Sequence, residues 1–311
     1  SYQELMNWNF VRHPRNPILP AVPDTWMEAQ TANPDLLLLG DTYHLYFRGQ
    51  QGGHDRIGVG MIEKERFDGV SWNIRSTPVI DVGAVGDWDE DHVLDPATVE
   101  VGGRVFLYYS AVCSRVHRSI CLATSTDGVN FQKYAGNPVV IGGGPEIVWR
   151  DGMFYLFYWK EVPGSTGFQL YLSVSDNGFD FKEYQPNPIL PIGRPGTWDS
   201  YTVETPRIAW WDGAYHMFYC GSDRFSDYPA HAGYATSTDL IHWHKHPQPV
   251  FSRGPEHSWD EGAIWFTTVE KIRDKYYLWY EGYGGGEARE KEYGSYLQGG
   301  KSQIGLAVMG A

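Results

Sequence analysis

A repeated module constrains the fold of this chain more than any other feature. In its fullest copy the pair Trp198–Asp199 is followed by Pro206, eight residues after the Trp, and then by an aromatic strand, Tyr215–Tyr219. Two other copies keep the same spacing from Trp to Pro, one keeps only the Trp-Asp pair, and one is shorter. These copies start at Trp26, Trp88, Gly144 and Trp259.

Five copies lie roughly 50–60 residues apart, and a period of this size indicates stacked or radial units. Three copies end in a further signature, of which Ala123–Phe131 is an example: a strand, a tight turn and an aromatic strand. Each unit thus holds about four short strands, rich in the β-favouring residues Val, Ile, Tyr, Phe and Trp. The sequence predicts an all-β chain, a five-bladed β-propeller with four antiparallel strands per blade and one domain over residues 1–311.

The two ends of the chain suggest how the last blade is completed. Its final strand, within 302–308, is not followed by an outer aromatic strand, whereas the segment Asn7–Phe10 is aromatic and has no other unit to join. We expect the N-terminus to supply the outer strand of the last blade. Deletion of residues 1–12 is therefore expected to destabilise the whole fold.

Charge and composition exclude several classes of protein. The formal net charge is −13 and there is no basic run, which argues against nucleic acid as a partner. No run of 18 apolar residues is present, so no membrane span is expected. The chain starts at Ser1 with no leader visible, which leaves a cytoplasmic or a secreted or periplasmic location open. Cys113, Cys121 and Cys220 are expected to be buried free thiols, with a Cys113–Cys121 pair as the alternative.

Acidic residues recur beside the module prolines. Because the innermost strand of each propeller blade lines a central channel, acids at this point of several blades would converge on one axis. Carboxylates crowded in this way take different pKa values and can act as general acid and general base, as in glycoside hydrolysis. The segments concerned are Asn33–Asp35, Asp95–Pro96, Pro145–Glu146, Glu204–Pro206 and Asp260–Glu261.

The pattern resembles the five-bladed propeller glycoside hydrolases, above all family 43, with relatives in families 32, 62, 68, 117 and 130. That family uses an Asp before Pro as general base, an Asp after Pro to tune the acid, and a Glu in Glu-Gly-Pro as general acid. Leu94-Asp95-Pro96, Gly144-Pro145-Glu146 and Val203-Glu204-Thr-Pro206 keep the order and the proline offsets. The resemblance implies that Asp95 is the base, Glu146 the tuning residue and Glu204 the acid.

The chain departs from the family in three respects. The carboxylates fall on the second to fourth blades instead of the first three, Glu146 replaces Asp, and Thr205 replaces Gly. An alternative assignment keeps the family's blade order, with Asp35 as base and Asp95 on the second blade. Asp35 is otherwise a candidate for substrate binding.

Four further residues are candidates for the substrate site. His92 lies three residues before Asp95, Arg207 follows Glu204 and could orient a carboxylate, and Glu261 belongs to the last copy of the module. His231 precedes a strand, and the family resemblance implies that a central His lies near a bound cation. No cofactor and no metal ligand set are expected, although the resemblance leaves room for a structural Ca²⁺ in the central channel.

The sequence therefore predicts an inverting, exo-acting glycoside hydrolase. Its substrate is expected to be an oligosaccharide or polysaccharide, and the resemblance favours α-L-arabinofuranosides, β-xylosides or related sugars. One alternative is a phosphorylase of the family 130 type, for which Arg150, Arg207 and Arg224 are the evident source of phosphate-binding charge. The other is a non-catalytic carbohydrate-binding propeller, because a fold does not fix a function.

Overall fold

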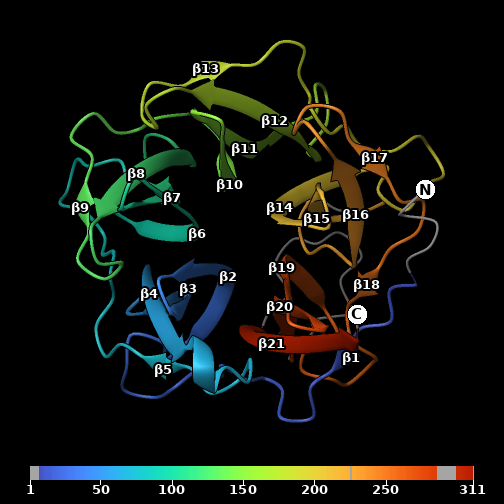
Figure 1. Cartoon of the computed structure of the whole chain (residues 1–311), viewed down its shortest axis with the longest axis horizontal. Coiled ribbons are helices and arrows are strands. Elements are labelled where there is room, and N and C mark those ends of the chain that lie inside the picture. The colour runs from blue at the N-terminus through green and yellow to red at the C-terminus, as the bar shows by residue number, and fades with distance from the viewer. Residues whose placement is uncertain (1–6, 225, 286–298, 311) are drawn as a thin grey trace. The chain divides into compact units, whose positions relative to one another are not determined.

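The computed structural model describes residues 7–224, 226–285 and 299–310, and none of these is α-helical. The fold is a five-bladed β-propeller in which each blade is an antiparallel sheet of four strands, as the repeat predicts (Figure 1). The first blade is β2 (Gln30–Leu39), β3 (Thr42–Gln51), β4 (His54–Glu63) and β5 (Asn73–Ile74), with a 3₁₀ turn η1 at Lys64–Arg66. The second is β6 (His92–Val101), β7 (Arg104–Val112), β8 (Ser119–Ser125) and β9 (Gln132–Lys133).

The remaining blades follow the same order. The third is β10 (Gly143–Arg150), β11 (Met153–Glu161), β12 (Phe168–Ser175) and β13 (Lys182–Glu183). The fourth is β14 (Thr202–Trp211), β15 (Ala214–Ser222), β16 (His231–Ser237) and β17 (His244–Lys245), and the short β18 (Phe251–Ser252) also pairs with β16. The fifth is β19 (Ala263–Ile272), β20 (Lys275–Gly284), β21 (Lys301–Gly310) and β1 (Val11–Arg12).

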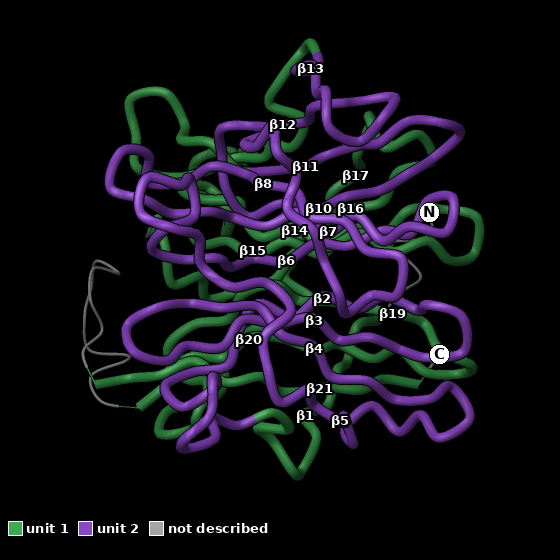
Figure 2. Tube along the Cα trace, turned by 90° about the vertical axis from the view of Figure 1, so that its left-hand side faces the viewer, with its two compact units in different colours: residues 1–19, 159–171, 185–311 green, residues 20–158, 172–184 purple. Residues whose placement is uncertain are grey.

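The chain divides into two compact units, coloured separately in Figure 2. Unit 1 comprises residues 1–19, 159–171 and 185–311, and unit 2 comprises residues 20–158 and 172–184. Each unit has a core of aromatic and aliphatic side chains from neighbouring sheets, and burial of this apolar surface is the main stabilising term. Tyr46, Leu107 and Tyr109 belong to the core of unit 2, and Phe218, Tyr234 and Tyr280 to that of unit 1.

The Asp of the Trp-Asp pair has a structural role that recurs in three blades. In the fifth blade, Oδ2 of the fully buried Asp260 accepts hydrogen bonds from the Tyr280 hydroxyl (2.7 Å) and from Nε of Arg12 (2.7 Å). We call this arrangement the aspartate clasp: an Asp before the inner strand, a Tyr 20 residues later, and a cation on the outermost strand. The other two clasps are Asp89–Tyr109–Lys133 and Asp199–Tyr219–Lys245.

The N-terminal segment completes the fifth blade, as predicted, with its strand displaced by a few residues. The paired residues are Val11 and Arg12, opposite Val308 and Ala307, rather than the segment Asn7–Phe10. Trp8 and Phe10 instead pack on the core of unit 1, where the Trp8 ring lies 4.8 Å from that of Tyr234. Aromatic anchoring and strand pairing therefore come from adjacent parts of the same segment.

The three cysteines are buried free thiols, so the first of the two expectations for them is confirmed. Burial raises the pKa of Cys121 to about 12 and that of Cys220 to about 11, which keeps both thiols protonated. In the part of the chain that the structure describes, no helix has the length and apolar character needed to cross a membrane.

Candidate active site

A β-bulge bends the inner strand of the blades at the module proline. The register with the second strand shifts between Ala32 and Asp35 in β2, and equivalent shifts occur in β6, β14 and β19. In every blade the residue before the proline position has a positive φ between 49° and 59°. Asn, Asp and Gly adopt this left-handed conformation readily, whereas Thr and Phe do so at a cost of roughly 1–3 kcal/mol. The five residues are Asn33, Asp95, Gly144, Thr205 and Phe266.

The bulge assigns a position to each candidate catalytic carboxylate. Asp95 is the bulge residue of β6, Glu146 follows the proline in β10, and Glu204 precedes the bulge in β14. All three side chains are buried, with 3–4% of each residue exposed. The three carboxylates differ in their offset from the proline. Each therefore lies at a different point of the same backbone bend, which recurs from blade to blade.

The expectation of an acid at this point in all five blades is wrong for the fifth. Its bulge is at Phe266–Thr267, eight residues after Trp259, whereas Asp260 and Glu261 lie in the turn before β19. Asp260 is held in the aspartate clasp. Glu261 accepts a hydrogen bond from the backbone N–H of His257 (2.5 Å) and so stabilises this turn.

In unit 2, Asp95 is fixed from two sides. Its Oδ2 accepts a hydrogen bond from Nη1 of Arg118 at 2.7 Å, and its backbone N–H donates to Oδ1 of Asn33 at 3.0 Å. Arg118 is three-quarters buried, so this ion pair is screened less than one on the surface. The guanidinium therefore holds the carboxylate of Asp95 in one orientation.

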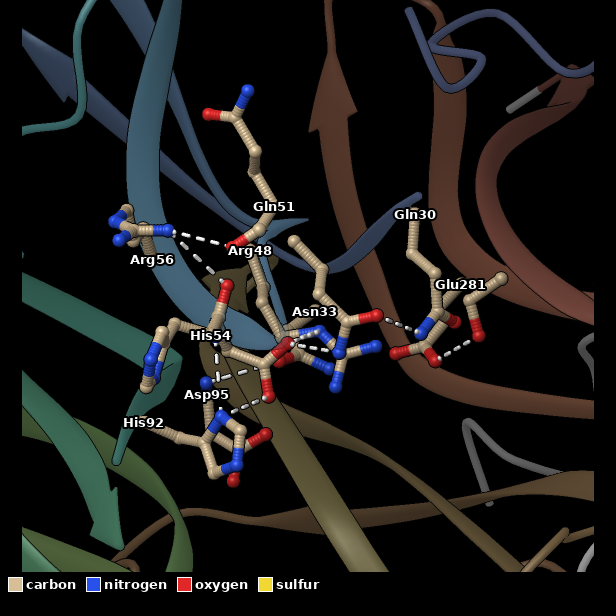
Figure 3. A network of polar contacts seen from close by, with 12 residues as sticks. Gln30, Asn33, Arg48, Gln51, His54, Arg56, His92, Asp95 and Glu281 are labelled. Atoms are coloured by element: carbon tan, nitrogen blue, oxygen red, sulfur yellow. Dashed lines mark hydrogen bonds and ion pairs between the residues drawn. The ribbon is translucent and has the colours of Figure 1, made fainter. Parts of the chain in front are cut away.

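A second polar cluster lies beside Asp95 and includes His92, from the same strand (Figure 3). Nδ1 of His92 lies 3.2 Å from Oδ2 of Asp55 and 3.1 Å from the backbone nitrogen of Asp55. Nε of Arg48 is 3.7 Å from Oδ1 of Asp55, and Gln50 donates to the same oxygen at 3.0 Å. Burial alone would raise the pKa of Asp55, but Arg48 and His92 outweigh it and the pKa is lowered. Asp55 is thus an ionised carboxylate that orients the imidazole of His92.

Asp35 and Glu146, also in unit 2, make different contacts. Oδ2 of Asp35 accepts hydrogen bonds from both the backbone N–H (3.0 Å) and the hydroxyl (2.6 Å) of Thr98. Asp35 is therefore bonded to the inner strand of the second blade. Oε1 of Glu146 accepts from the N–H of Ile147 at 3.0 Å, a contact within its own strand.

In unit 1, Glu204 is linked to a neighbouring loop through Thr202. The hydroxyl of Thr202 donates to Oε2 of Glu204 at 3.2 Å, and the same oxygen of Thr202 accepts from the N–H of Phe168 at 3.0 Å. Thr202 and Glu204 are two residues apart on β14, so their side chains share one face of the strand. A hydroxyl donor toward one carboxylate oxygen fixes the orientation of Glu204.

The other candidates of unit 1 differ in exposure. The guanidinium of Arg207 is buried and lies 4.3 Å from the centre of the Phe266 ring, a cation–π contact. His231 is half-buried, with Nδ1 2.7 Å from the hydroxyl of Ser252, and burial and then Arg253 lower its pKa.

No metal centre is evident among the described residues, where no three His, Cys, Asp or Glu side chains are grouped so as to hold an ion. The structural Ca²⁺ suggested by the family resemblance stays a prediction. Carbonyl and water ligands would serve that hard cation without such a group.

Several residues of the site escape sequence reasoning. Arg118, Asp55 and Arg48 belong to no repeat, and only the fold places them beside Asp95 and His92. Thr202 could have been identified, because strand alternation puts it on the same side as Glu204.

The sequence was compared with protein families and with individual proteins. No protein-family model matches the chain. An uncharacterized protein of Mycobacterium tuberculosis is 24% identical over 265 residues, which cover 79% of this chain and 86% of that protein.

Solved structures are similar over nearly the whole length. The β-1,2-mannobiose phosphorylase of Listeria innocua is 12% identical with a TM-score of 0.73, covering 97% of each chain. A thermostable family-43 glycoside hydrolase is 17% identical with a TM-score of 0.67, covering 94% of this chain and 91% of that one. The chain therefore has the five-bladed β-propeller fold that occurs in glycoside hydrolases and in glycoside phosphorylases.

Proposed function

We propose that this protein is an inverting glycoside hydrolase that acts on an oligosaccharide. The observation that carries the proposal is the set of three buried carboxylates, Asp95, Glu146 and Glu204, beside the residue with positive φ in three inner strands. Burying a carboxylate is costly, and a fold retains several at one kind of position where they serve a function. The similarity in fold to a family-43 enzyme supports this reading.

Each residue has a role that its surroundings suit. Glu204, with Thr202 fixing one oxygen, is the general acid that protonates the departing glycosidic oxygen. Asp95, oriented by Arg118, is the general base that removes a proton from the attacking water. Inverting enzymes keep such a pair about 6.5–9.5 Å apart so that water fits between base and sugar. Glu146 is the third carboxylate, to which the resemblance assigns the tuning of the acid.

The sugar is expected to be an α-L-arabinofuranoside or β-xyloside, with release from the chain end. The similar protein of Listeria innocua is a β-1,2-mannobiose phosphorylase, so β-1,2-mannosides belong in the same set of trial substrates. His92, oriented by Asp55, is a candidate to bind a hydroxyl of the sugar.

A phosphorylase is the second candidate, because the Listeria neighbour is one. It requires cationic side chains that accept phosphate. Arg207 lies against the Phe266 ring and Arg150 lies 3.5 Å from Asp151, so both guanidinium groups already contact other side chains. Arg224, after β15, is the third candidate for phosphate, and the dependence of activity on phosphate tests it. The hydrolase is therefore preferred.

The test is product release from aryl glycosides and from arabino-, xylo- and β-1,2-manno-oligosaccharides, each with and without inorganic phosphate. The wild type should release free sugar without phosphate, and Glu204→Gln should lose at least about 100-fold in kcat, the usual range for general acid–base catalysis. Glu256→Gln, at a largely exposed residue, is the matched control and should keep full activity. Sugar phosphate as the product would establish the phosphorylase, and no turnover in either buffer would reject both enzymes.

A further inference from the structure

Unit 1 contains a pocket that the proposed chemistry does not yet use. It has a volume of about 790 Å³ and is formed by the loop 162–167, between β11 and β12, together with Glu161 and Tyr201. Tyr201 directly precedes β14, the strand that carries Glu204 three residues later. The volume is within the range of small-molecule sites.

The loop is built rigidly. The N–H of Val162 donates to the carbonyl of Gly167 at 2.8 Å, and the N–H of Ser165 donates to the carbonyl of Val162 at 2.9 Å. A Cβ atom on Gly167 would meet the carbonyl oxygen of Tyr201, so only glycine permits the loop to pack there. These contacts hold the loop against Tyr201.

Tyr201 forms one wall of this pocket, and its ring is held in place. The hydroxyls of Tyr201 and Thr166 are 2.6 Å apart, so the tip of the ring is tied to the loop. Hydrogen bonds from Thr166 and Ser165 lower the pKa of Tyr201, because hydroxyl donors stabilise its phenolate form. An aromatic ring fixed at its polar end, with hydroxyls and the carboxylate of Glu161 around it, suits the apolar face and the hydroxyl groups of a sugar.

A chain of hydrogen bonds joins this loop to Glu204. Phe168, directly after the loop, donates its N–H to Thr202, and Thr202 donates its hydroxyl to Glu204. The general acid must reach the oxygen of the leaving group, so a pocket connected to it in this way belongs to the leaving-group side of the scissile bond.

We infer that the pocket of loop 162–167 and Tyr201 binds the leaving-group sugar of a neutral oligosaccharide. The inference rests on the proposed function. The Tyr201 ring stacks on the sugar, and the Glu161 carboxylate accepts hydrogen bonds from the sugar hydroxyls. Thr202 links the loop to Glu204 through its two hydrogen bonds.

The experiment compares two substrates of whichever sugar the trial set identifies: its 4-nitrophenyl glycoside, which has no leaving-group sugar, and its trisaccharide. Tyr201→Ala should lower kcat/KM for the trisaccharide by about 10–100-fold, the effect of losing about 1.4–2.8 kcal/mol of stacking and hydrogen bonding. The 4-nitrophenyl glycoside should change less than about threefold. Tyr277→Ala, at a half-buried tyrosine of β20 in the same unit, is the control and should show no such split.

The outcomes separate this inference from the proposed function. Equal losses on both substrates, or no loss on either, would overturn the leaving-group pocket and leave the hydrolase intact. If the wild type turns over nothing, the proposed function fails, and the pocket is judged by saturation-transfer NMR with arabinotriose, xylotriose and β-1,2-mannotriose. Signals that disappear in Tyr201→Ala would then support a sugar-binding pocket, and signals that persist or are absent in the wild type would refute it.

Discussion

Removal of the Arg12 guanidinium is the sharpest test of how the fifth blade is held together. The substitution Arg12→Ala leaves the buried carboxylate of Asp260 with the Tyr280 hydroxyl and without its cation. It also removes a cation–π contact, because the guanidinium of Arg12 lies 4.4 Å from the centre of the Phe251 ring. Asp260 lies 248 residues further along the chain, so the contact fastens the N-terminal strand to the last blade.

The expected cost follows from the burial of the two partners. Breaking a fully buried ion pair from one side costs about 3–5 kcal/mol. The side chain of Arg12 is 29% exposed and that of Asp260 is 1% exposed, so water reaches the site in the variant and a cost below that range, about 2–3 kcal/mol, is expected. At about 2–4 °C per kcal/mol for a large domain, the melting temperature should fall by about 4–12 °C.

The assay is thermal unfolding followed by circular dichroism at neutral pH. Arg12→Lys should retain most of the stability, because lysine occupies the same place in the clasps of Lys133 and Lys245. In a double-mutant cycle, Asp260→Asn combined with Arg12→Ala should cost less than the sum of the single changes. An Arg12→Ala protein that melts within 1 °C of the wild type, or single effects that add fully, would refute the clasp as a stabilising device.

Three further predictions follow from the described contacts. Burial lowers the pKa of His216 to about 4, so its neutral form stabilises the fold above pH 6.5 by up to about 3 kcal/mol. That stability is lost as pH falls from 6.5 toward 4, and denaturant titrations should show a weaker pH dependence in His216→Gln. Thr202→Val should lower kcat by about 10-fold and, because the N–H of Phe168 loses its acceptor at a cost of about 1 kcal/mol, the melting temperature by about 2–4 °C. Thr202→Ser keeps the hydroxyl and should be near wild type in both a steady-state assay and thermal unfolding. Arg118→Ala should reduce kcat/KM by at least about 10-fold, and recovery of activity on adding guanidinium ion would confirm that its charge orients Asp95.

The fold could be predicted from the sequence because each copy of the repeat contains residues with local structural preferences. The turn residues and the β-favouring aromatic residues recur at the same spacing. The spacing of eight from Trp to Pro marks the inner strand, and it holds even in the fifth blade, where Thr267 stands at the proline position after Trp259. The role of the Asp in that pair could not be predicted, because it depends on a Tyr 20 residues away and on a cation from another strand. Asp260 was accordingly expected at the site and lies instead in a clasp.

The sequence could predict only the candidate carboxylates that lie within two residues of the module proline. Asp95, Glu146 and Glu204 are identified by their offsets from that residue, and the bulge explains why the offsets matter. Partners that orient these groups, such as Arg118, which lies between β7 and β8, are not part of the repeated motif. Contacts of this kind join residues distant in sequence, such as Arg118 and Asp95 across the second blade, and a local pattern does not encode them.

The central claim is that Glu204 is the general acid. Its most direct test is whether the activity that Glu204→Gln loses depends on the leaving group of the substrate. The wild type and Glu204→Gln are compared on a 2,4-dinitrophenyl glycoside and on the corresponding disaccharide. A dinitrophenolate departs without a proton, so kcat/KM for it should fall less than about 10-fold, whereas that for the disaccharide should fall at least about 100-fold. Equal losses on the two substrates would contradict the assignment and show that Glu204 does not protonate the leaving group.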